Sequence, residues 1–217
     1  MEQASLLVRR RMKTPRAAGV AGIVFSILLI TSQVMIWRSI PPNPLSSPVE
    51  LAQKAASVGF ALNLIPFAGV AFLWFVAVVR DRLGIYEDRF FATVLLGSGL
   101  LYIAMMFTGV ALSSALIAQV GRGTEELASS GAYALGREQI GRLMGVFSTK
   151  MAAVFMFTTS RIFWRTRILP RPMMYFSYAL AILFLVSTGS VRWVAAIFPV
   201  WVFAISAYIL FERPAVE

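Results

Sequence analysis

Long stretches without a charged residue restrict most strongly how this chain can fold. Residues 17–37 and 90–120 contain no Asp, Glu, Lys or Arg. An apolar stretch of about 18 residues or more is typical of a helix that spans a bilayer, because a helix satisfies its own backbone hydrogen bonds. The composition agrees, since 59% of the residues are hydrophobic and 14% are charged, against about 25% charged in soluble domains. The sequence therefore predicts an all-α integral membrane protein.

We predict a bundle of about six transmembrane helices in a single membrane domain, residues 17–213. A basic head, residues 1–16, precedes this domain, and a short tail, residues 214–217, follows it. Residues 144–164 have the weakest pattern, because Lys150 lies within them; if they did not span, five helices would remain and the last two would reverse their orientation. The predicted spans are 17–37, 55–79, 90–114, 144–164, 173–189 and 193–211.

The positions of the basic residues predict that both termini lie in the cytoplasm. Lys and Arg are enriched in cytoplasmic loops. With the N-terminus inside, the cytoplasmic side holds the basic head, the basic residues between 80 and 89, those between 161 and 171, and Arg213. The net charge of +10 then reflects topology in the cytoplasmic membrane, and we expect no nucleic-acid partner. Outside the cytoplasm would lie Arg38, Lys54, Arg122, Arg137, Arg142 and Arg192.

The second helix is predicted to begin before its membrane span, near Pro48. Ser47 can cap the first amides, and Glu50 stands three residues on, as in a capping box. Proline suits the first position of a helix because its missing N–H would have no partner there. Pro66 lies inside the same helix and should kink it, because its ring excludes the carbonyl four residues back.

The residue types that are missing exclude much enzyme chemistry. The chain has no Cys and no His, which removes disulfides, thiolate chemistry, thiol or imidazole metal sites and His-based proton relays. None of the six predicted spans contains Asp or Glu, the groups that proton-coupled pumps use at depth. The glycine-rich phosphate-binding motifs are also absent from the sequence. We therefore expect no catalytic residue, no metal and no cofactor.

Three residues are candidates for binding a ligand: Lys150, Asn63 and Pro66. Lys150 is a candidate because a charge inside a span is costly unless it has a role. It could form an anion site, with a backbone carbonyl, a lipid phosphate, or an anionic substrate or cofactor as its partner. Alternatively, its four-carbon stem could carry the ammonium toward the interface. Asn63 and Pro66 could form a broken-helix site of the transporter type. Their alternative is an interhelical hydrogen bond beside a packing kink.

Two further groups of residues are predicted to make contacts. Small residues on a membrane helix let a neighbouring backbone approach closely. These helix-packing candidates are Ala18, Gly22, Gly97, Gly99, Gly109 and Ser113. Clustered cytoplasmic arginines attract anionic lipid headgroups. The headgroup candidates are Arg9, Arg10, Arg11, Arg165, Arg167 and Arg171.

The segment DRLGIYEDRFFATVLLGSGLLYIAMMF resembles one that recurs in small uncharacterised prokaryotic multi-spanning membrane proteins. The resemblance covers about residues 80–107. It implies a multi-pass membrane protein and brings no assigned activity, cofactor or site residue.

Three functions fit these features. The first is a non-enzymatic structural, assembly or accessory subunit that packs with itself or with another membrane component, since packing faces are present and catalytic groups are missing. The second is a transporter or channel for a small solute, with Lys150 and the Asn63/Pro66 kink at its site. The third is an anionic-lipid-binding protein that uses the basic cytoplasmic face.

Overall fold

The structure, a computed structural model, describes residues 2–39, 48–81, 89–120, 131–166, 170–187 and 194–211. Every regular element within these ranges is a helix, so the all-α prediction is confirmed for this part of the chain. The segment labelled η2 is π-helical and joins α5 directly to α6. In chain order the elements are α1 (Glu2–Ser39), α2 (Pro48–Asp81), α3 (Arg89–Val120), α5 (Ala132–Gly141), η2 (Arg142–Phe147), α6 (Ser148–Thr166), α7 (Arg171–Val186) and α8 (Val194–Phe211).

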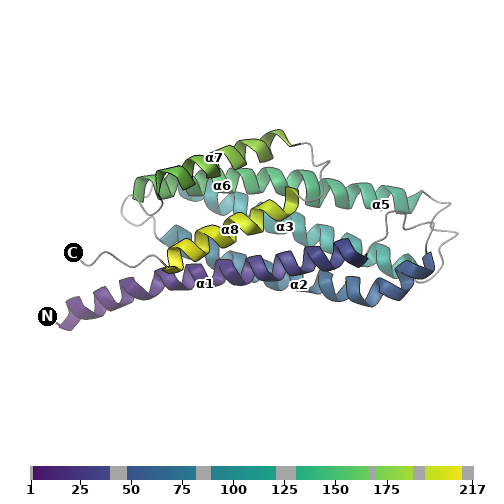
Figure 1. Ribbon diagram of the computed structural model, residues 1–217, viewed down its shortest axis with the longest axis horizontal. Coiled ribbons are helices and arrows are strands. Elements are labelled where there is room, and N and C mark those ends of the chain that lie inside the picture. The colour runs from purple at the N-terminus through teal and green to yellow at the C-terminus, as the bar shows by residue number, and fades with distance from the viewer. Residues whose placement is uncertain are drawn as a thin grey trace.

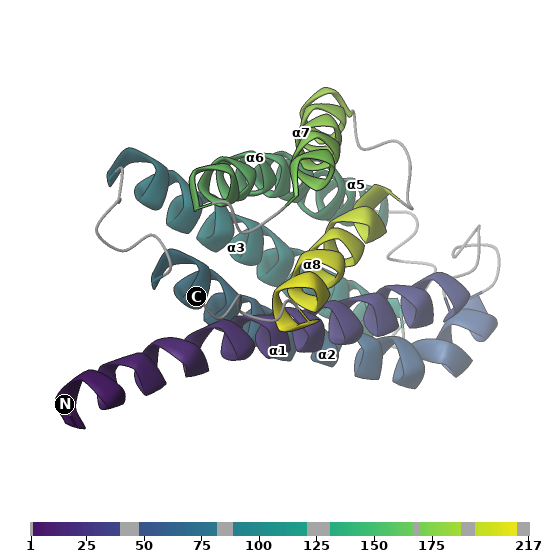
Figure 2. The ribbon, with the colours of Figure 1, turned by 60° about the vertical axis from the view of Figure 1, so that its left-hand side comes forward.

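The helices form an elongated antiparallel bundle (Figure 1). α1 packs along α2 and α8, and α3 packs along α2 and α6. α7 lies at the edge of the bundle, where it packs along α6 (Figure 2). The start of α1 and the end of α8 lie toward the same end of the bundle (Figure 1).

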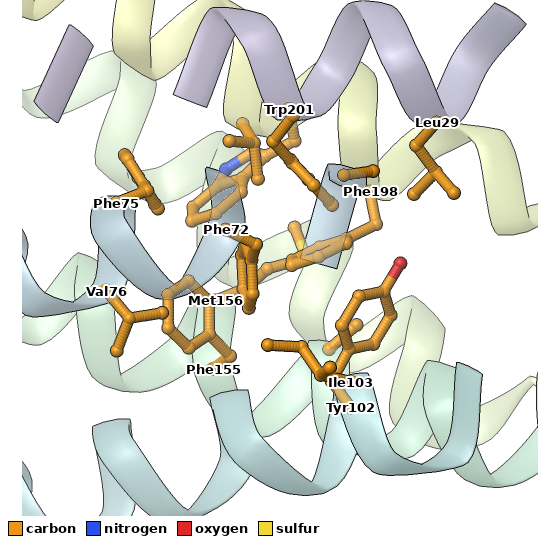
Figure 3. Close-up of a cluster of buried hydrophobic side chains, with 14 of the residues drawn as sticks. Leu29, Phe72, Phe75, Val76, Tyr102, Ile103, Phe155, Met156, Phe198 and Trp201 are labelled. Atoms are coloured by element: carbon orange, nitrogen blue, oxygen red, sulfur yellow. The ribbon is translucent and has the colours of Figure 1, made fainter. Parts of the chain in front are cut away.

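Aromatic rings meet where α1, α2, α3, α6 and α8 converge (Figure 3). We call this the central aromatic cluster; its members are Phe25, Phe72, Phe75, Tyr102, Phe155, Phe198 and Trp201. Phe72 is its hub and is fully buried. Its ring centroid lies between 4.7 and 6.1 Å from those of Phe25, Phe75, Tyr102, Phe155 and Phe198. Because aromatic rings attract one another at these separations, a single side chain of α2 links four other helices.

Glycines allow two pairs of helices to approach closely. A methyl group at Gly22 on α1 would lie only 2.0 Å from Ser206 Oγ on α8 and 2.9 Å from the Phe75 ring. On α3, a methyl group at Gly109 would lie 2.3 Å from Met144 Cγ in η2. These positions have no room for a larger side chain, as expected where small residues bring membrane helices together.

Large apolar side chains cover the outside of the bundle, whereas several serine and threonine side chains lie inside it. Phe67, Trp74 and Val186 are 67%, 69% and 75% exposed, while Ser32 and Ser160 are buried. Ser160 donates a hydrogen bond to the carbonyl of its own helix one turn back, and Ser32 donates one to Ala61 O on α2, at 2.6 Å. Such a surface is unlike that of a water-soluble protein and suits contact with lipid.

Five helical stretches are long and apolar enough to cross a membrane, which suggests a multi-pass membrane protein. The predicted span 144–164 belongs to one of them, which starts earlier, at Ala132. The predicted span 173–189 is shorter than expected, because α7 has 16 residues and ends at Val186. Its length of about 24 Å is less than the roughly 30 Å of a hydrocarbon core. The five stretches are Ala17–Ser39, Gln53–Arg80, Arg89–Gln119, Ala132–Trp164 and Val194–Phe211.

The helices extend beyond the predicted spans at two places. Residues 2–16 of the predicted basic head are helical and continue directly into the apolar part of α1. α2 begins at Pro48, where the sequence predicts its start, and continues through Pro66. Pro66 has no N–H, so the carbonyl of Leu62 lacks its usual donor within the helix.

The contact between Gly22 and Ser206 predicts the effect of adding one methyl group. We expect Gly22→Ala to lower the free energy of unfolding by about 1–3 kcal/mol, because α1 and α8 must separate to admit the methyl group. Gly97→Ala is the matched control, since a methyl group at Gly97 meets no atom within 4 Å, and it should cost nothing. Denaturant titration of both variants in detergent measures the difference. Equal stabilities would contradict the close approach at Gly22.

Candidate functional site at the end of helix α7

The ammonium group of Lys150, on α6, lies at the C-terminal end of α7. Its Nζ donates hydrogen bonds to the carbonyl oxygens of Phe184 at 3.3 Å, of Ser187 at 2.6 Å, and of Leu185. An ammonium group carries three hydrogens, so each of them has an acceptor. We call these three oxygens the α7 carbonyl site.

The end of α7 explains why these oxygens are available. The last four carbonyls of a helix have no donor within the helix. The N–H of Ser187 bonds to Leu183 O at 2.9 Å, and the carbonyls of Phe184 and Leu185 then receive Lys150. The C-terminus of a helix also carries a partial negative charge, which favours a cation. Lys150 therefore has both its charge and its hydrogen bonds matched by the backbone, with no carboxylate among its three acceptors.

The antiparallel contact between α6 and α7 brings Lys150 to this position. Two aromatic pairs link these helices farther along α6, about two and four turns beyond Lys150: Phe157 with Tyr178 at 5.1 Å, and Trp164 with Tyr175 at 5.7 Å between ring centroids. Because α6 and α7 run antiparallel, the start of α6, which carries Lys150, lies beside the end of α7.

The π-helical segment η2 ends just before Lys150. A π-helix has more residues per turn than an α-helix, and such segments are frequent at functional sites. Ser148 and Thr149 donate hydrogen bonds to the carbonyls of Met144 and Gly145, which belong to η2. The side chains that precede Lys150 thus bond to the backbone of the irregular segment.

A second hydrogen bond ties α7 to the bundle. Trp201 Nε1 on α8 donates to Ser177 Oγ on α7 at 2.8 Å, and Ser177 Oγ donates to Met173 O at 2.8 Å. Both side chains are buried. Neither Trp201 nor Ser177 is among the site residues predicted from the sequence. The available signal is the position of Trp201 far from the ends of its apolar stretch, because a buried tryptophan N–H usually has an acceptor.

The other ligand-binding candidates do not take part in the hydrogen bonds of Lys150. Asn63 is exposed on α2, and Pro66 is partly buried there. All three acceptors of Lys150 lie on α7 or directly after it. The three candidates therefore do not form one hydrogen-bonded site in this structure. Whether Lys150 binds a solute stays a prediction.

The helix-packing candidates lie in different surroundings. Ala18 is buried, and a methyl group at Gly99 would lie 3.2 Å from Val76. Ser113 is partly buried and bonds to Gly109 O at 2.7 Å. Gly97 differs from the expectation and points to open space. It precedes Gly99 by two residues, which places it about 200° away around the helix.

Arg171 is the headgroup candidate whose side chain the structure describes, and it is exposed at the start of α7. Arg167 lies outside the described residues. The side chains of Arg9, Arg10, Arg11 and Arg165 also lie outside the described part, although their backbone belongs to α1 and α6.

No protein-family model, curated protein or solved structure matches this chain. Function therefore has to be inferred from the chain's own residues. Among the residues that the structure describes, no group of three acidic side chains gathers as a metal site would require.

The contacts of Lys150 predict a structural effect of replacing it. Lys150→Met keeps most of the side-chain volume but leaves the carbonyls without donors, so we expect a loss of about 1–3 kcal/mol in the free energy of unfolding. Arg137→Met removes an equal charge from an exposed position on α5 and should change stability by less than about 0.5 kcal/mol. Denaturant titration in lipid bicelles compares the two. If Lys150→Met left the free energy of unfolding unchanged, the ammonium would not be needed to stabilise α7.

Proposed function

We propose that this chain is a multi-pass protein of the cytoplasmic membrane that serves as a structural, assembly or accessory subunit and performs no catalysis. The hydrogen bonding of Lys150 carries this proposal. An ionisable side chain deep in a membrane helix is a first candidate for transport or chemistry. Here its three hydrogens all bond to the α7 carbonyl site, so its charge holds two helices of the same chain together.

Several features support a position for the bilayer. Trp164 and Tyr175 form an edge-to-face pair at 5.7 Å, and such rings favour the interface between lipid and water. About 20 residues of helix, or roughly 30 Å, lead from Trp164 to Met144. Lys150 would then lie about 9 Å from the opposite surface. α5 would stand beyond that surface, where the exposed ion pair of Arg142 with Glu138, at 2.8 Å, is in water.

We further propose six crossings with both termini in the cytoplasm. The start of α1 and the end of α8 lie toward the same end of the bundle (Figure 1), which supports an even number of crossings. The excess of Lys and Arg at that end supports its cytoplasmic position. In this arrangement α7 is the fifth and shortest crossing, and it ends below the outer surface. The capping of α7 by Lys150 supports that depth.

A transporter or channel is the second candidate, and one observation favours it. α7 ends inside the proposed hydrocarbon layer, and helix ends at such depth are typical of transporter sites. An anionic-lipid-binding role has weaker support in Arg171, which is exposed near Trp164 and Tyr175.

One substitution separates transport from the structural role. If Lys150 is only structural, Lys150→Met protein that remains folded should keep any solute flux that the native protein has.

The subunit proposal predicts a stable complex. The protein is extracted from its native membrane in a mild detergent, and the intact assembly is weighed by native mass spectrometry. We expect a mass above that of the single chain, either from a second kind of subunit or from further copies. A harsh detergent applied to the same sample should dissociate the assembly and serves as the control. A single chain under both conditions would contradict the proposal.

A further inference from the structure

We propose that the α7 carbonyl site is a binding site for a primary ammonium ion, and that Lys150 is the tethered ligand that fills it. The proposal differs from the earlier hypothesis of an anion at Lys150. In that hypothesis the ammonium is the binding group, whereas here the backbone oxygens of α7 are the binding groups. The inference rests on these contacts and does not depend on the subunit role.

The geometry of the site matches an ammonium group. Three carbonyl oxygens, from Phe184, Leu185 and Ser187, surround one nitrogen. A primary ammonium group presents three hydrogens at its free end. The distances to Phe184 O and Ser187 O, 3.3 and 2.6 Å, are those of N–H···O hydrogen bonds. The ammonium group therefore matches the three carbonyl oxygens in its number of hydrogen-bond donors and in its charge.

The site belongs to α7 and does not depend on the Lys150 side chain for its construction. All three oxygens are main-chain atoms at one helix end, and their orientation follows from the helix and from Ser187, which adopts φ −56° and ψ 132°. The negative end of the helix dipole adds attraction for any cation placed there. Trp201 donates a hydrogen bond to Ser177, which lies nearer the start of α7. This bond helps to keep α7 in place when residue 150 is shortened.

Tethering explains why the native site would be filled by Lys150. A ligand attached to the same protein has an effective concentration in the millimolar range or above. External ammonium ions therefore compete poorly in the native protein. Shortening residue 150 should open the site to a small ion of the same chemistry.

Chemical rescue tests the proposal. Lys150→Ala removes the stem and the ammonium, and we expect its unfolding temperature to fall by about 4–10 °C. Methylammonium chloride should restore at least half of that loss in a saturable titration. Tetramethylammonium chloride at equal ionic strength should not, because this cation has no N–H to donate to the carbonyl oxygens. Lys150→Met fills the space with an apolar chain, so methylammonium should not rescue it.

Two results would overturn the proposal. One is a folded Lys150→Ala protein whose unfolding temperature does not respond to methylammonium. The other is an equal response to methylammonium and tetramethylammonium, which would show a general salt effect. If Lys150→Ala protein folds too poorly to purify, the yield of monodisperse protein extracted with each salt becomes the measurement, and equal yields would have the same meaning.

A second variant tests the requirement for an ammonium group at this point. The chain contains no cysteine, so Lys150→Cys creates a single thiol. Alkylation with 2-bromoethylamine rebuilds a side chain that ends in an ammonium, and we expect it to restore the unfolding temperature of the native protein. Alkylation with iodoacetamide adds a neutral group of similar size and should not. Equal recovery with both reagents would contradict an ammonium site.

Discussion

Backbone carbonyls at the end of a helix need hydrogen-bond donors, and this need is greatest where apolar groups surround the helix end. α7 ends at Val186, in a region where Leu183, Leu185 and Val186 are themselves exposed on the outside of the bundle. In a bilayer no water would reach these carbonyls from the lipid side. Lys150 supplies the donors from α6, and this contact stabilises the end of α7 and its alignment with α6.

The remainder of the bundle is held together differently. Phe72 joins α1, α2, α3, α6 and α8 through ring contacts in a fully buried cluster, and Gly22 lets α1 and α8 close on each other. α7 contributes no ring to the central aromatic cluster. It is attached through its contacts with α6, through Lys150 and through the hydrogen bond from Trp201 to Ser177. Loss of either polar link should therefore loosen α7 before the rest of the bundle.

The sequence predicts the elements of this fold better than the contacts between them. Uncharged stretches such as residues 17–37 and 90–120 predict helices because a backbone in lipid has few alternatives. The early end of α7 was missed, because the apolar pattern continues up to the non-helical Ser187. A backbone carbonyl was among the expected partners of Lys150, but which carbonyls could not be predicted, since they lie 34 to 37 residues away. Gly97 and Gly99 look equivalent in sequence, and only the rotation of α3 separates them.

The central claim is that the ammonium of Lys150 bonds to the end of α7 in the membrane. Solid-state NMR in lipid bilayers tests it through the distance from 15N-labelled Lys Nζ to 13C-labelled serine carbonyls, in Lys13→Arg and Lys54→Arg protein so that one lysine remains. The account predicts a carbon within about 4 Å of the nitrogen, and a signal that disappears in Ser187→Ala protein, where that carbonyl is unlabelled. A nitrogen with no labelled carbon within about 6 Å would place the ammonium elsewhere and contradict the account.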